Sequence, residues 1–139
     1  MTKVFFYTRM LILLAAIGGF GACDDKDEVP RPESFRVTGE IYGNGSPVSG
    51  IYVEFETRNA EGTGYAAMDI TGEDGLFDIV VNDLDGTTQF SIKTKENVEG
   101  NPVQYENKEI TISLNDFTVI DGKASKNLGR IELTRRTAN

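Results

Sequence analysis

Apolar and polar residues alternate along most of this chain in short runs, which is the pattern of β-strands rather than of helices. From residue 35 onward the runs are separated by Gly, Asn, Asp and Pro, the residues that favour turns. No run has the spacing and length expected of an amphipathic helix. Seven runs meet the criteria for strands: Phe35–Ile41, Ile51–Phe55, Tyr65–Ile70, Leu76–Val81, Phe90–Thr94, Lys108–Leu114 and Leu128–Leu133.

Seven short strands at this spacing predict an all-β fold, a single antiparallel seven-stranded β-sandwich over residues 35–139. Segment 115–126 is then the longest loop. Its Phe117, Val119 and Ile120 are apolar, so they either pack on an edge of the sandwich or form a contact surface. The residues expected to fill the core are Val37, Ile41, Ile51, Val53, Phe55, Phe77, Ile79, Val81, Phe90, Ile92, Ile110, Ile112, Leu114, Leu128, Ile131 and Leu133.

The N-terminal 22 residues have the layout of a secretory signal. Lys3 and Arg9 precede an apolar stretch, Met10–Phe20, which is followed by small residues and then by the single cysteine, Cys23. The stretch has about half of the roughly 20 apolar residues that a membrane-spanning helix needs, so a transmembrane anchor is disfavoured. A lone thiol in an exported protein has no disulfide partner and needs another explanation.

The junction at Cys23 resembles the lipobox of bacterial lipoproteins, in which the cysteine becomes the first mature residue and carries acyl chains. The resemblance implies a lipoprotein signal peptide over 1–22, lipidation of Cys23, and stable attachment once two or more chains are present. Residues 23–34 are interpreted as a lipidated acidic tether, because they lack apolar periodicity. The run Asp24–Glu28 resembles the export signal of Bacteroidota lipoproteins displayed on the outer face of the outer membrane; a solvated spacer is the alternative.

Composition narrows the chemistry that the mature chain can perform. The formal net charge of −8 becomes −10 when Lys3 and Arg9 are removed with the signal, which disfavours nucleic acid and anionic membrane surfaces as partners. The chain has no His, so it lacks the base of a Ser-His-Asp triad and the usual ligands of a zinc site. We therefore expect that the protein is not an enzyme, that it binds no cofactor, and that it has no catalytic, cofactor-binding or metal-binding residues.

Three groups of carboxylates are candidate calcium-binding or catalytic sites, and a structural role is favoured for each. Asp83-Leu84-Asp85-Gly86 lacks the alternating oxygen ligands of an EF-hand and is expected to be a turn, as is Gly72-Glu73-Asp74-Gly75. Glu54 and Glu56 alternate with core residues and are expected on a solvated face rather than as a catalytic pair.

Aromatic residues near strand ends offer one further candidate site. Tyr42, Tyr52, Tyr65 and Tyr105 could form an exposed platform that stacks on a sugar or a peptide. The favoured interpretation is that they cap the core and keep their hydroxyls in water.

Segments of the predicted sandwich also resemble known families. Val37–Ile41, Gly45–Val53 and Thr71–Ile79 resemble the carboxypeptidase regulatory-like, transthyretin-like sandwich, with its Gly-x-Pro-Val-x-Gly corner and its Thr-Asp-x-x-Gly-x-Phe turn. Gly72 stands where that family has Asp. The C-terminal half resembles the radical SAM-associated putative lipoproteins of Bacteroidota through Asn82–Gly86, Lys108–Leu114 and Lys126–Leu133.

Together these inferences predict a non-enzymatic lipoprotein, anchored to the outer membrane by its lipid and exposed at the cell surface if the acidic run acts as an export signal. Its sandwich would act as a binding or interaction module at the cell envelope, with a protein or a glycan as partner. The second resemblance implies an alternative, a substrate or accessory protein of a radical SAM modifying enzyme. Either role is compatible with more than one oligomeric state.

Overall fold

The computed structural model describes residues 31–59, 62–82, 84, 89–97, 99 and 102–137. The chain divides into two compact units, 1–31 and 32–139, and the described fold is that of the second. Within these residues no helix is long and apolar enough to cross a membrane. The elements are β1 (Ser34–Gly43), β2 (Ser46–Pro47), β3 (Ile51–Asn59), β4 (Gly62–Ile70), β5 (Leu76–Asn82), β6 (Gln89–Glu96), β7 (Glu109–Ser113), the 3₁₀ turn η1 (Leu114–Asp116), β8 (Thr118–Ile120) and β9 (Lys123–Leu133).

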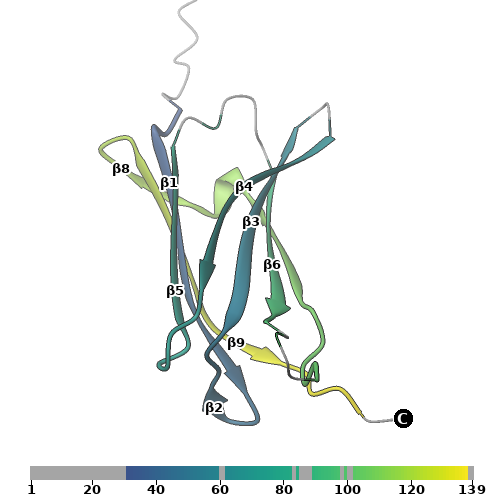
Figure 1. Cartoon of the computed structure of the whole chain (residues 1–139). Coiled ribbons are helices and arrows are strands. Elements are labelled where there is room, and N and C mark those ends of the chain that lie inside the picture. Colours follow the sequence, from purple (N-terminus) through teal and green to yellow (C-terminus); the bar gives the residue numbers. More distant parts are fainter. Residues whose placement is uncertain are drawn as a thin grey trace, which may run out of the picture. The chain divides into compact units, whose positions relative to one another are not determined.

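These strands form two sheets that enclose one core (Figure 1). In sheet A, β1 pairs with β5, with β9 and, at its end, with β2, and β9 also pairs with β8. Sheet B has the order β4-β3-β6-β7. The all-β sandwich predicted from the sequence is confirmed. Six of the seven predicted runs lie within strands, and the seventh, Lys108–Leu114, extends one residue beyond β7 at each end. The described residues add two short strands that the pattern did not predict, β2 and β8.

One strand pairing contradicts the prediction that the sandwich is antiparallel. The first and last long strands, β1 and β9, run parallel, from the pair Ser34 and Lys123 to the pair Gly43 and Leu133. Sequence signals for turns report local hairpins, and hairpins join antiparallel neighbours. A parallel neighbour is reached only through a long connection, here most of the domain, so no local pattern reports it.

The parallel pair contains a bulge. Thr38 pairs with Asn127 and Glu40 with Arg130, so two residues of β9 face Gly39 alone. One of them is Gly129, whose φ of 65° lies in the left-handed region that glycine tolerates. The bulge explains why the core positions of β9 step by three residues, from Leu128 to Ile131, and not by two.

Segment 115–126, predicted to be the longest loop, is mostly regular structure. It contains part of η1, all of β8, the two-residue turn Asp121-Gly122 and the start of β9. Both turn residues have positive φ, 49° and 72°, as a tight hairpin turn requires. Strand β8 escaped prediction because it has three residues and all of them are exposed. Phe117 packs in the core, whereas Val119 and Ile120 remain 49% and 66% exposed, so both interpretations of this segment hold in part.

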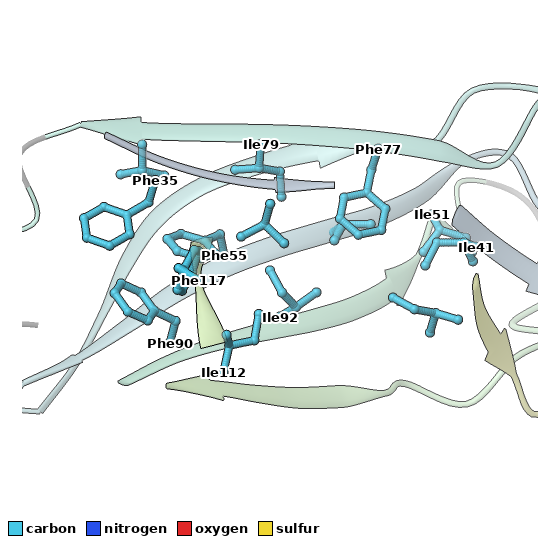
Figure 2. Packing of buried hydrophobic residues seen from close by; sticks show 14 of the residues in the cluster. Phe35, Ile41, Ile51, Phe55, Phe77, Ile79, Phe90, Ile92, Ile112 and Phe117 are labelled. Atoms are coloured by element: carbon cyan, nitrogen blue, oxygen red, sulfur yellow. The ribbon is translucent and has the colours of Figure 1, made fainter. Parts of the chain in front are cut away.

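The core is organised around four phenylalanines from both sheets (Figure 2). The ring of Phe90 lies 5.1 Å from that of Phe35, 5.4 Å from that of Phe55 and 5.2 Å from that of Phe117, measured between centroids. Most other predicted core residues are also buried, although Ile110, Leu114 and Leu128 are only partly buried. Three residues of the buried hydrophobic cluster are missing from the predicted core: Phe35, Phe117 and Ala124.

The turn after β4 is held against the corner that precedes β3. The buried Thr71 hydroxyl donates a hydrogen bond to the Val48 carbonyl (2.7 Å) and accepts one from the Ile51 N–H (3.0 Å). The Thr71 carbonyl accepts a further bond from the Gly50 N–H (2.9 Å). Because buried polar groups are costly without partners, these bonds fix both turns relative to each other.

Replacing Gly75 with alanine should destabilise this corner strongly. Gly75 has a φ of 73°, and a methyl group there would lie 2.5 Å from the Ile41 carbonyl oxygen. The left-handed backbone and the forced displacement together should cost at least about 3 kcal/mol in the free energy of unfolding. Gly45→Ala is the matched control, since Gly45 has a φ of 80° and open space around it, and should cost about 1 kcal/mol. Equal losses in urea denaturation of the two variants would contradict the packing argument.

Phe117→Ala tests whether the segment before β8 belongs to the core. Phe117 is 8% exposed and contacts two other phenylalanine rings, so its removal should cost about 3 to 5 kcal/mol in urea denaturation. Val119→Ala, two residues later on the exposed strand, should change stability by no more than about 0.5 kcal/mol. A Phe117 variant as stable as the Val119 variant would rule out this role.

Candidate binding face

The solvent side of sheet A, here called the sheet A face, is formed by alternate residues of β1, β5, β8 and β9. Strand alternation places core residues such as Val37 and Ile79 on one side, and their neighbours on the other. Three large aliphatic side chains stay exposed on this face, Leu76, Val80 and Ile120. Val80 and Ile120 line one hollow. Neighbouring exposed aliphatic residues are more informative than single ones, because they cost solubility unless something covers them.

An ion pair crosses the centre of the sheet A face. The Arg36 guanidinium donates through Nε to Asp78 Oδ1 (2.8 Å) and through Nη2 to Oδ2 (2.5 Å). These hydrogen bonds hold the pKa of the Asp78 carboxyl below its ordinary value of 3.8 and raise the pKa of Arg36. Both side chains are roughly half exposed, so the pair orders the face more than it stabilises the fold.

A hollow of about 490 Å³ lies on this face beside the point where the chain joins the sandwich. We call it the tether-side hollow; its lining includes Ser34, Arg36, Val80, Ile120 and Lys123. Residues 32 and 33 were expected in the tether, but Pro32 is buried and the Glu33 N–H donates to the Gly122 carbonyl (2.7 Å). The last residues of the tether are therefore bonded to the β8–β9 turn.

A second hollow, of about 500 Å³, lies where β5 meets the turn that precedes it, and four carboxylates line it: Glu40, Asp69, Asp74 and Asp78. Three of them already have structural partners. Asp69 Oδ2 accepts the Asp78 N–H (2.8 Å), Asp74 Oδ1 accepts the Leu76 N–H (3.0 Å), and the Asp78 carboxylate binds Arg36. In the part of the chain that the structure describes, no group of three or more His, Cys, Asp or Glu is placed to hold a metal ion.

Where the structure describes the carboxylates that the sequence singled out, they lie in a turn or on the outer side of sheet B. Gly72–Gly75 is a turn, closed by a hydrogen bond from the Gly75 N–H to the Gly72 carbonyl (2.9 Å), as predicted. Glu54 and Glu56 lie on the outer side of sheet B, and Glu56 pairs with the Lys93 ammonium (2.7 Å), which raises the pKa of Lys93. Cys23, Asp83 and Asp85 lie outside the described residues.

The three tyrosines whose side chains are described are spread over the domain and form no common platform. Tyr42 lies on the sheet A face, beneath the Arg130 guanidinium, which is 3.7 Å from the ring centroid. Tyr52 lies on the outer side of sheet B, in register with Lys95. The Tyr105 ring occupies the space above Gly43, where a methyl group would clash with it. The Tyr65 side chain is outside what the structure describes.

Sequence reasoning missed the tether-side hollow, although it noted Ile120 as an apolar residue of unsettled role. The hollow joins β1, β5, β8 and β9, which are far apart in the sequence. The available signal was the alternation along β5, which places the aliphatic Val80 opposite the core side of its strand.

No protein-family model and no curated protein sequence matches the chain. Several solved structures resemble it in fold. The shaft pilin SpaA from Lactobacillus rhamnosus GG is 13% identical with a TM-score of 0.50, over 75% of this chain and 50% of the pilin. Chlorocatechol 1,2-dioxygenase from Pseudomonas putida is 11% identical with a TM-score of 0.50, over 76% of this chain and 62% of the enzyme. A DUF3823 family protein from Parabacteroides merdae ATCC 43184 is 15% identical with a TM-score of 0.43, over 76% and 47%.

The fold places the described domain in the class of β-sandwich domains. At these identities the likeness shows the fold alone, and the chain covers less than two thirds of each of the three proteins. Because the three include an enzyme and a pilin, the fold class does not by itself specify a function, which must come from the surface of this particular chain.

Arg36→Gln should raise the pKa of Asp78 toward its ordinary range, because the neutral amide no longer favours the charged carboxylate. A lowered pKa in the folded state stabilises the fold at neutral pH, and this contribution is lost as the pH falls through that pKa. The wild-type protein should therefore show a steeper loss of stability below about pH 4 than the variant. Carboxyl-detected NMR titration reads the pKa of Asp78 directly. Arg130→Gln is the control and should leave it unchanged; a similar shift in both variants would contradict the assignment.

Proposed function

We propose that the protein is a non-enzymatic lipoprotein, held at the outer membrane by acyl chains on Cys23, and that its sandwich is a binding module at the cell envelope. The observation that carries the proposal is the separation of the two parts. Among the described residues, the buried hydrophobic cluster extends from Phe35 to Leu133, after the tether. Residues 23–31 can then serve attachment without disturbing the fold.

The sheet A face supports the binding role. Leu76 is exposed there, at the start of β5 and outside the tether-side hollow. The face also carries an ordered ion pair and an arginine stacked on Tyr42, which suit a protein or glycan partner that offers both polar and apolar groups.

We also propose that the sandwich is of the transthyretin-like type. The residues that carry this resemblance contact one another: the aromatic ring of Phe77 covers Gly39, and Gly75 lies against Pro47. A methyl group on Gly39 would lie 2.7 Å from that ring. The motif residues are thus close-packing positions, which is a physical reason for the resemblance to extend over these segments.

Cys23→Ser should abolish membrane attachment. A serine cannot carry the thioether-linked lipid, and the acidic chain has no other strong attraction for a bilayer, so the membrane-bound fraction should fall by at least about tenfold. Fractionation of cells and incorporation of labelled palmitate measure the loss. Ser49→Ala, an exposed substitution within the sandwich, is the matched control and should keep both signals.

Retention of membrane binding by the Cys23→Ser protein would reject the lipid anchor. Intact mass of the purified mature protein adds a second test. The proposal expects only the mass of the acylated cysteine, and any further mass on residues after Cys23 would favour the alternative role as substrate of a modifying enzyme.

A further inference from the structure

The β8–β9 turn carries Ile120, which at 66% is the most exposed large hydrophobic side chain among the described residues. The turn is tight, because its two residues, Asp121 and Gly122, both adopt positive φ. Ile120 pairs directly with Lys123 across the turn. The isoleucine is therefore the last strand residue before a tight turn, and its side chain is largely exposed.

This hairpin end is bonded to the residue through which the tether joins the sandwich. The Glu33 N–H donates to the Gly122 carbonyl at 2.7 Å, and Ser34 begins β1 beside the same turn. An extended chain spans at most about 3.6 Å per residue, so the stretch from Cys23 to Glu33 reaches no further than about 35 Å. Any surface that holds Cys23 is therefore within reach of Ile120. Because the attachment at Cys23 already holds the chain at that surface, a contact of Ile120 with it has the lower entropy cost of an intramolecular association.

The chemistry around Ile120 suits a lipid interface. Lys123 has a long aliphatic stem and a cationic head that can lie among headgroup phosphates while the isoleucine enters the apolar boundary. Val80 lines the same hollow and adds aliphatic surface, and none of the residues that line it is aromatic, which disfavours a stacking site for sugars. The net charge of the mature chain is strongly negative, so zwitterionic headgroups fit better than anionic ones.

We infer that the β8–β9 turn is a membrane contact. With Cys23 anchored, Ile120 inserts at the interface of a zwitterionic bilayer and fixes the orientation of the sandwich. The opposite end, with the Thr71–Gly75 turn, then faces away from the lipid; Figure 1 shows this turn, between β4 and β5, at the end of the domain opposite to β8. The inference rests on the lipid anchor of the proposed function and adds a defined orientation of the sandwich relative to the membrane.

The test uses the chain from Cys23 to Asn139, which contains the whole core, with the Cys23 thiol coupled chemically to a maleimide lipid in phosphatidylcholine nanodiscs. Isoleucine and valine methyl groups are labelled for NMR, and a nitroxide headgroup lipid is added. The Ile120 methyl signal should broaden strongly. Ile70, also exposed (46%) but located beside the Thr71–Gly75 turn, is the internal control and should keep its intensity. Equal broadening of both signals, or none, would overturn the inference.

Variants extend the same measurement. Ile120→Ser should lower the membrane-contacting fraction about fivefold, as the loss of part of one aliphatic burial predicts, read from the broadening of the Val80 methyl signals. Ile70→Ser should leave it unchanged, and anionic lipid should weaken the contact. A contact insensitive to Ile120→Ser, or strengthened by anionic lipid, would count against the inference. Because the lipid is attached chemically, failure here concerns the turn alone, whereas failure of the Cys23→Ser test in cells concerns the anchor.

Discussion

The parallel pairing of β1 with β9 is the contact on which the rest of the sandwich depends. Strand β1 lies between β5 and β9 and contributes Phe35, Val37 and Ile41 to the core. Because β9 is the last strand of the domain, β1 gains its second neighbour only when the whole intervening chain is in place. This long loop must be closed before its contacts contribute, so the domain stabilises as one cooperative unit.

Close approaches at glycine positions let aromatic rings cover this pairing. Gly39 in β1, opposite the bulge in β9, leaves room for the ring of Phe77, and Gly43 at the end of β1 leaves room for Tyr105. The segment around Tyr105 also bridges the two sheets, because the Glu106 N–H donates to the Thr134 carbonyl (2.8 Å) just beyond β9. One end of the sandwich is thus sealed by the chain after β9, and the other by the bond between Glu33 and Gly122.

The hollow lined by four carboxylates has mainly structural contacts. Asp69 and Asp74 accept backbone N–H groups of β5, and the Asp78 carboxylate binds Arg36. The Asp69 side chain faces inward and accepts a hydrogen bond from the Asp78 N–H at the edge of β5 that faces away from β1. This bond also protects that edge from pairing with another chain. Val80 and Ile120, which are exposed near the tether, have no such contacts to backbone N–H groups, and this contrast is why the membrane-contact inference rests on them.

The sequence by itself determined where the strands lie and which side of each faces inward, because both follow from alternation over adjacent residues and from local turn chemistry. It also singled out Cys23, whose interpretation needs no fold. Only the tertiary structure decided that β1 and β9 are parallel neighbours, that Phe117 and Ala124 are buried, and that Ile120 projects beside the tether. Those outcomes depend on which segments, distant in the sequence, come to lie beside a residue. Such contacts do not change the alternation of apolar and polar residues near that residue, so the sequence pattern does not report them.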